Sequence, residues 1–207
     1  NRRAIEESGN IAAQYDVYGQ GAIMSSSERF QYILEFAHKV IHELLHGTSY
    51  VALMGREEDS TKVISAHRCG LGVVGLDKNG KGFSFFHKLN EAITEELAIR
   101  FDRRFFPQIP ALKEGIAERD GFLRFFNLGS NVSGEIAVAK RVDEERWSVG
   151  EFSYQEDRFQ LYGLIHEIFT KRQGEFNSPE DVFQVFVRAA FSGKNTELAE
   201  LVESVYG

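Results

Sequence analysis

Cysteine is almost absent from this sequence: Cys69 stands alone, so an internal disulfide is excluded. No apolar run approaches the ~20 residues that a membrane-spanning helix needs. Basic residues are outnumbered, with 24 Lys and Arg against 31 Asp and Glu and a net charge of −7. This balance argues against a nucleic-acid footprint. We therefore expect a soluble globular chain with no membrane span and no nucleic-acid partner.

The length of 207 residues is enough for one sizeable domain. Eighteen phenylalanines against one tryptophan indicate a core rich in phenylalanine. Because the chain begins at Asn1 without a methionine, we expect a trimmed piece or a part of a longer protein, and the lack of a signal peptide says little. Composition does not fix the compartment or the oligomeric state, although we lean to the cytoplasm.

The most informative stretch is His42-Glu43-Leu44-Leu45-His46, an H-E-x-x-H motif. Two histidines four residues apart on a helix project from one face, one turn from each other. Both imidazoles can then bind one tetrahedral Zn²⁺. The residue after the first histidine is Glu43, which would lie beside a metal-activated water as its base.

The surrounding residues predict a helix over about 28–46, ended by Gly47. Ser25 and Glu28 are spaced as a capping box at its start. The expected buried stripe consists of Phe30, Ile33, Leu34, Ala37, Ile41 and Leu44. The motif residues would then lie on the opposite face, toward a substrate cleft. The alternative is that they form the solvated face of a surface helix.

A second helix is predicted from Leu89 onward, with Glu91 and Glu95 on one face. A catalytic zinc needs a third protein ligand and one open position. Glu91 can be that ligand, and Glu95, one turn on, can accept the free N–H of a ligating histidine and fix its tautomer. The alternative is a pair of glutamates on a solvated helix face.

H-E-x-x-H followed at a distance by Asn90-Glu91-x-x-Thr94-Glu95 resembles the gluzincin metallopeptidases. The resemblance implies that His42, His46 and Glu91 ligate one zinc ion, that Glu43 is the base, and that Glu95 orients a histidine. The gap between the motifs is longer than in the thermolysin-like branch, so the resemblance is to the clan.

Two other H-E-x-x-H families fit less well. Metzincins place a third histidine six residues after the second, where this chain has Ala52. Peptide deformylases use an upstream cysteine ligand, whereas Cys69 lies downstream.

The resemblance and the hydrophobic patterns together predict an α+β, zincin-like fold in a single domain over 1–207. A small mixed sheet and the active-site helix are expected in 1–88, and an all-helical part carrying the third ligand in 89–207. A polar loop is expected over 55–62, and a substrate-pairing edge strand within 63–76. The predicted strands are 63–67, 71–76 and 82–87; the predicted helices are 89–104, 111–126, 153–172, 179–191 and 197–205. Residues 135–141 fit either a strand or a helix extension, and we favour the helix.

The proposed reaction is hydrolysis of a peptide or protein substrate, and it requires a donor to the tetrahedral oxyanion besides the metal. Gluzincins often use a Tyr or His from the helical part. Tyr154, at a predicted helix start, is the first choice, and Tyr162, His166 and Arg158 are further candidates. The alternatives are that both tyrosines lie at the core edge and that Arg158 forms an ion pair.

Three other histidines are interpreted separately. His38 is expected to be an ordinary surface histidine, because two imidazoles and a carboxylate already complete the protein's ligands. His67 and His87 are weighed as site groups against ordinary strand histidines.

Three functions remain open at this stage. The leading one is a zinc metallopeptidase acting through Glu43. The second is a catalytically inactive zincin-like module that binds metal or a protein partner, although an intact Glu43 argues against it. The third is a helical interaction domain in which the motif is accidental. The sequence does not give the substrate, and it does not separate endopeptidase from exopeptidase.

Overall fold

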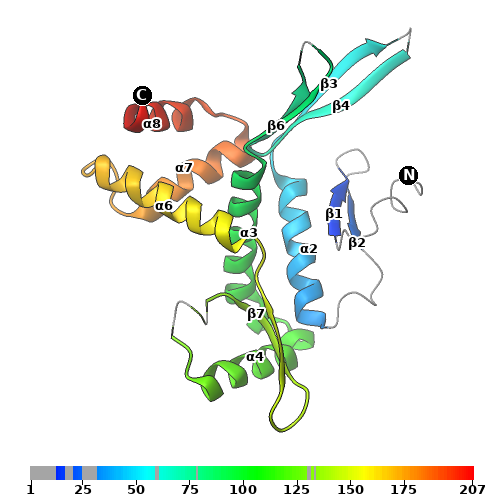
Figure 1. The fold of residues 1–207 in the computed structure, drawn as a ribbon, viewed down its shortest axis with the longest axis vertical. Coiled ribbons are helices and arrows are strands. Elements are labelled where there is room, and N and C mark those ends of the chain that lie inside the picture. The colour runs from blue at the N-terminus through cyan, green and yellow to red at the C-terminus, as the bar shows by residue number, and fades with distance from the viewer. Residues whose placement is uncertain are drawn as a thin grey trace. The chain divides into compact units, whose positions relative to one another are not determined.

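The computed structural model of the chain describes residues 13–16, 21–24, 32–58, 61–77, 79–129, 132 and 134–207. Within this part it contains six α-helices and eight strands (Figure 1). The helices are α2 (Ile33–Thr48), α3 (His87–Phe105), α4 (Lys113–Phe126), α6 (Gln155–Lys171), α7 (Pro179–Ser192) and α8 (Thr196–Tyr206). The strands are β1 (Ala13–Asp16), β2 (Gly21–Met24), β3 (Val51–Glu58), β4 (Thr61–Cys69), β5 (Gly72–Leu76), β6 (Gly82–Phe85), β7 (Ile136–Arg141) and β8 (Trp147–Glu151).

The mixed α+β class is confirmed, but the prediction of a mixed sheet is wrong, because every named strand pairs antiparallel. The largest sheet has four strands in the order β3-β4-β5-β6. Its strands follow one another in the chain through short connections, whereas a parallel pair would need a crossover of a dozen or more residues. The outer strands are therefore β3 and β6, whereas the edge strand was expected within 63–76.

Two segments were assigned to the wrong structure. The expected loop over 55–62 is instead the distal part of a hairpin, with Glu58 opposite Thr61 in the backbone register. Backbone hydrogen bonds form such a hairpin whatever its side chains are, so the polar composition of 55–62 did not indicate a strand. The helix expected over 135–141 is strand β7, which pairs with β8 and is closed by a turn in which Asp143 accepts from the N–H groups of Glu145 and Arg146.

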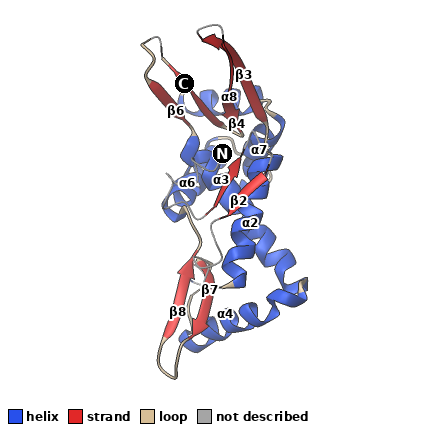
Figure 2. Ribbon diagram, turned by 90° about the vertical axis from the view of Figure 1, so that its right-hand side faces the viewer, coloured by secondary structure: helices blue, strands red, loops and turns tan. Residues whose placement is uncertain are grey.

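The hairpin β7–β8 means that the C-terminal part is not all-helical, as was predicted. Ile136 and Val138 are β-branched and favour a strand, and their neighbours Ala137 and Ala139 are buried as well. Residues buried on both sides of a strand give no alternation that a sequence pattern could detect. Strand β7 packs on α4 (Figure 2).

The remaining helices lie close to their predicted ranges. Helix α7 begins with a capping box, in which the Ser178 side chain accepts from the Asp181 N–H and the Asp181 carboxylate accepts from the Ser178 N–H. Helix α2 ends at Thr48, one residue beyond Gly47. Its predicted start at Ser25 and Glu28 lies outside the described residues. No helix that the structure describes is long and apolar enough to span a bilayer.

The chain divides into two compact units, one formed by 1–47 and 97–153 and the other by 48–96 and 154–207. Helix α3 contributes its N-terminal half to the second unit and its C-terminal half to the first. The single domain expected over 1–207 stays a prediction.

In the first unit, Leu34 of α2 packs with Phe106 and Leu112. The predicted buried stripe of α2 is only partly correct, because Ile33 and Leu44 are 55% and 50% exposed. The buried positions are instead Leu34, His38, His42 and Glu43. A hydrophobicity pattern does not reveal this face, since most of its buried residues are polar.

His38 was expected to be a surface histidine, but this prediction is wrong, because His38 is buried. Its Nδ1 lies 3.8 Å from Oδ2 of Asp102, which is fully buried, and its ring lies 4.8 Å from that of Phe152. Arg119 donates to both carboxylate oxygens of Asp102, at 3.2 and 3.0 Å. This bidentate pairing compensates the burial of the Asp102 charge.

In the second unit, helices α6, α7 and α8 pack on one another (Figure 1). The sheet is held at the C-terminal end of α7 by Arg68 of β4. Its guanidinium donates to the carbonyl oxygens of Gly193 and Ala189, at 3.0 and 3.3 Å, and lies over the Tyr50 ring. The base of the four-stranded sheet is thereby fixed on α7.

Candidate metal centre

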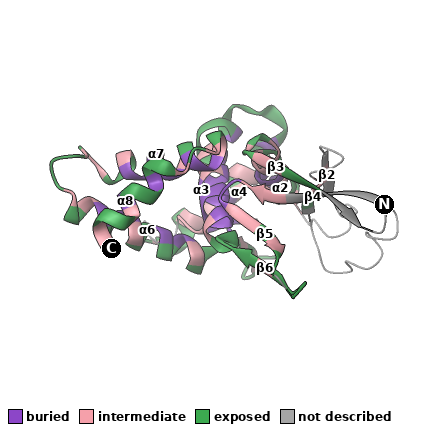
Figure 3. Cartoon of the chain, turned by 90° about the horizontal axis from the view of Figure 1, so that it is seen from above, coloured by how far each residue is buried: buried purple, intermediate pink, exposed green. Residues whose placement is uncertain are grey.

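The stretch 90–96 of α3 is buried around its whole circumference, since each of its residues is buried (Figure 3). Three of these residues are glutamates: Glu91, Glu95 and Glu96 are 6%, 0% and 7% exposed. Carboxylates are almost never buried unless they are paired or ligate a metal. The solvated-face alternative for Glu91 and Glu95 is therefore wrong, and this stretch requires compensating cations or donors.

The two motif histidines face each other at the end of α2. Their Nε2 atoms lie 3.1 Å apart, and the ring planes are at 75°. The helix produces this approach by itself, because residues four apart are separated by one turn. His42 is 3% exposed, and His46 is the more accessible of the two.

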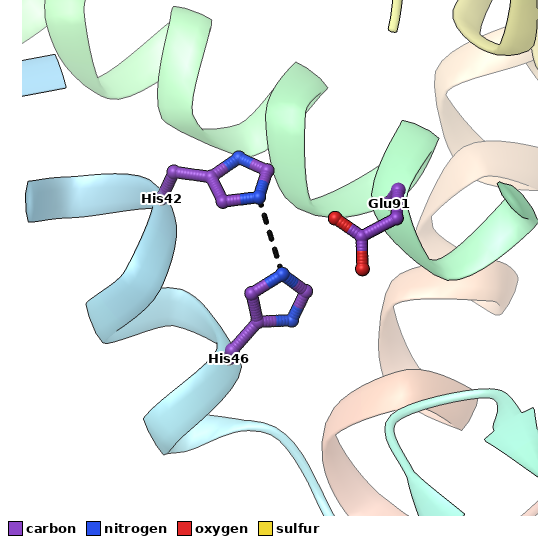
Figure 4. A group of neighbouring side chains, drawn as sticks. All are labelled: His42, His46 and Glu91. Carbon is purple, nitrogen blue, oxygen red and sulfur yellow. Dashed lines mark hydrogen bonds between the residues drawn. The ribbon is translucent and has the colours of Figure 1, made fainter. Parts of the chain in front are cut away.

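The carboxylate of Glu91 completes a group with these two rings (Figure 4). One ligand atom from each of His42, His46 and Glu91 lies within 4.8 Å of the others. Ligand atoms about 2.05 Å from Zn²⁺ at the tetrahedral angle are about 3.3 Å apart. The two nitrogens already have nearly this spacing, and the carboxylate oxygen needs to move by about 1.5 Å at most.

The donor set fits a metal ion. Two imidazole nitrogens and one carboxylate oxygen are ligands that divalent transition metals accept. The alternative is a hydrogen bond between the rings, in which one Nε2–H donates to the other Nε2. A bound metal would instead require both Nε2 lone pairs, with the protons on Nδ1. This choice of tautomer separates the two interpretations.

The structure places the predicted base and the predicted orienting carboxylate in buried positions. Glu43, the residue after His42, is 6% exposed, and Glu95, one turn after Glu91, is fully buried. A buried carboxylate needs hydrogen-bond donors, and a ligating histidine supplies one from its second nitrogen. The roles of Glu43 and Glu95 stay predictions.

Two of the weaker candidates are engaged with Glu96. The Tyr162 hydroxyl donates to Oε2 of Glu96, and Nη1 of Arg158 lies 3.9 Å from the same oxygen. Arg158 is 3% exposed, so its ion pair is buried. His166 is exposed, and its carbonyl oxygen accepts from Thr170. Among the His, Cys, Asp and Glu residues that the structure describes, His166 is not part of the metal-binding group.

Tyr154 is the N-cap of α6 and has left-handed backbone dihedrals, with φ 54° and ψ 32°. A residue other than glycine rarely adopts this conformation, and such strained residues cluster at functional sites. Tyr154 is 39% exposed. His87 is another neighbour of the group, with Nδ1 3.6 Å from Oε1 of Glu91, whereas His67 is not part of it.

Sequence reasoning gave no role to several buried polar residues, among them Glu96, Asp102, Arg119 and Asn90. Glu96 follows the motif directly but has no place in it, and Asp102 and Arg119 stand outside any motif. Only Asn90 carried a signal, since it belongs to the Asn-Glu pair of the second motif.

Comparison with known proteins identifies no relative: no family model matches the chain, and no curated protein or solved structure matches it.

Proposed function

We propose that this chain is a zinc-dependent metallopeptidase of the gluzincin type, with His42, His46 and Glu91 as ligands of one Zn²⁺. The observation that carries the proposal is the approach of two imidazole nitrogens to 3.1 Å, with a buried carboxylate oxygen within 4.8 Å of both. The substrate is a peptide or a protein.

The ligand types favour zinc or a related transition metal over magnesium and calcium. Mg²⁺ and Ca²⁺ prefer sites made only of oxygen, whereas imidazole suits zinc and its transition-metal neighbours. Structural zinc sites have four protein ligands, and catalytic sites have three and leave one position for water or substrate. The described residues supply three ligands to the group, which supports a catalytic site.

Zinc would supply Lewis-acid polarisation of the scissile carbonyl and would activate a water molecule for attack. A carboxylate oxygen of Glu43 accepts the proton of that water and later returns it to the leaving amine. Because Glu43 is buried, bulk water has little access to the proton while the carboxylate holds it.

Two further residues complete the proposal. Glu95 accepts the Nδ1–H of a ligating histidine and so keeps the Nε2 lone pair directed at the metal. Tyr154 donates its phenolic O–H to the oxyanion. Its strained backbone supports this role, because strain is retained where the surrounding structure requires a particular side-chain position.

Removal of the metal should abolish hydrolysis. The purified chain is incubated with a tryptic peptide mixture, and new cleavages are read by mass spectrometry, which detects both endopeptidase and exopeptidase activity. Dialysis against 1,10-phenanthroline should remove the activity, and equimolar Zn²⁺ should restore it, because the protein residues alone do not polarise the carbonyl.

Magnesium at the same concentration serves as the control and should not restore activity, since it binds imidazole poorly. Cleavage that survives complete loss of zinc, verified by metal analysis, would contradict the proposed function.

A further inference from the structure

The turn between β4 and β5 is fixed by hydrogen bonds on several sides. The N–H of Gly70 donates to the carbonyl oxygen of Tyr50 at 2.7 Å, and Nε of Arg68 donates to the carbonyl oxygen of Gly70 at 2.7 Å. The N–H of Leu71 donates to Oδ1 of Asn90 at 2.9 Å in a buried environment. Since Arg68 also binds the end of α7, this turn is a rigid point of the second unit.

The contact with Asn90 is so close that position 70 accepts only glycine. A Cβ at Gly70 would lie 2.0 Å from Oδ1 of Asn90 and 3.0 Å from its Cγ. The backbone φ of +56° also disfavours other residues. Asn90 itself is 4% exposed, so its side chain has little freedom to move aside.

The backbone of Asn90 is fixed as well. Its N–H donates to the carbonyl oxygen of Phe86 at 2.9 Å, in the first turn of α3. Its carbonyl oxygen accepts from Oγ1 of Thr94, which is buried, also at 2.9 Å. Asn90 and Thr94 are the two members of the Asn-Glu-x-x-Thr-Glu motif that have no part in the chemistry, and here they bind each other.

We propose that Asn90 is a positioning residue for the metal ligand Glu91. By holding the Gly70–Leu71 turn, the Asn90 side chain fixes the rotation of the first turn of α3 about its axis. Glu91 is the next residue, so this rotation determines where its carboxylate points. The inference rests on the proposed function, because it takes Glu91 to be a ligand.

The test measures zinc affinity by competition with a chromophoric chelator, and the visible spectrum of the Co²⁺-substituted protein. Asn90→Ala should weaken zinc binding about 10- to 100-fold, the usual effect of losing a group that orients a ligand, and should change the Co²⁺ bands. Asn90→Asp keeps an oxygen acceptor for the Leu71 N–H. Its zinc affinity and its Co²⁺ spectrum should therefore be close to those of the wild type.

Gly70→Ala tests the same contact from its other side. It should weaken zinc binding in the wild-type background and have a smaller effect beside Asn90→Ala, because the clash with Oδ1 is then absent. Ser178→Ala is the matched control: it removes a helix cap elsewhere in the same unit and so lowers stability, and it should leave zinc affinity and the Co²⁺ spectrum unchanged.

Wild-type affinity and an unaltered Co²⁺ spectrum in folded Asn90→Ala would overturn the inference, as would equal effects of Asn90→Ala and Ser178→Ala. The experiments also distinguish failure of the role of Asn90 from failure of the proposed function. A wild-type chain that binds zinc without cleaving peptides contradicts the peptidase alone, and the affinities then still decide the role of Asn90. A wild-type chain that binds no zinc overturns both.

Discussion

Glu43→Gln should reduce peptide hydrolysis by at least about 10²- to 10⁴-fold, the usual contribution of a positioned general base, while zinc content stays at the wild-type value. The substitution keeps the size and a hydrogen-bonding oxygen of the side chain but removes its ability to accept the proton of the attacking water. The measurement pairs kcat/KM for a peptide identified in the cleavage screen with metal analysis of the same sample.

Glu35→Gln is the matched control, because it makes the same change on the same helix about two turns earlier. Burial raises the pKa of Glu35, and Lys39 opposes this shift, so Glu35 is also partly removed from water. The Glu35→Gln variant should hydrolyse the peptide at the wild-type rate. Unchanged turnover in Glu43→Gln would show that the catalytic assignment is wrong. Zinc binding without turnover in the wild type would favour the alternative of an inactive metal-binding module.

The second large effect concerns the ligands themselves. His42→Ala, His46→Ala and Glu91→Ala should each weaken zinc binding by at least about 10²-fold. Structural zinc sites bind with about 10–16 kcal/mol over four ligands, so the loss of one ligand removes several kcal/mol. The thermal stabilisation that excess zinc gives the wild type should decrease in each variant, because it depends on the ratio of zinc concentration to Kd.

His166→Ala is the control for this series, because it removes an exposed histidine outside the group. It should bind zinc as the wild type does. Full zinc affinity in Glu91→Ala would exclude Glu91 as the third ligand, and full affinity in either histidine variant would exclude the two-histidine site.

The approach of His42 and His46 could be predicted from the sequence because their spacing is local. Residues four apart on a helix share a face whatever surrounds them, so the approach of the two rings depends mainly on α2 being a helix. The choice of Glu91 depended on the motif Asn90-Glu91-x-x-Thr94-Glu95, and the structure brings its carboxylate to the rings.

Features that depend on distant partners could not be predicted. His38 is a polar residue that the sequence alone places at the surface. Its burial depends on Asp102 and Arg119, which lie 64 and 81 positions further along the chain. In the same way, the register that makes β7 a strand depends on β8, and the position of Asn90 depends on Gly70 and Leu71. Local propensity is a weak guide where tertiary contacts decide the conformation.

The central claim is that one metal ion is bound by two imidazoles of α2 and a carboxylate of α3. Anomalous diffraction at the zinc absorption edge, on crystals of the wild-type chain with equimolar zinc, tests it most directly. The account predicts one peak at about 2.0–2.2 Å from Nε2 of His42, Nε2 of His46 and a carboxylate oxygen of Glu91. A peak at another place would contradict the claim. So would the absence of any peak in crystals in which the two rings remain hydrogen-bonded to each other.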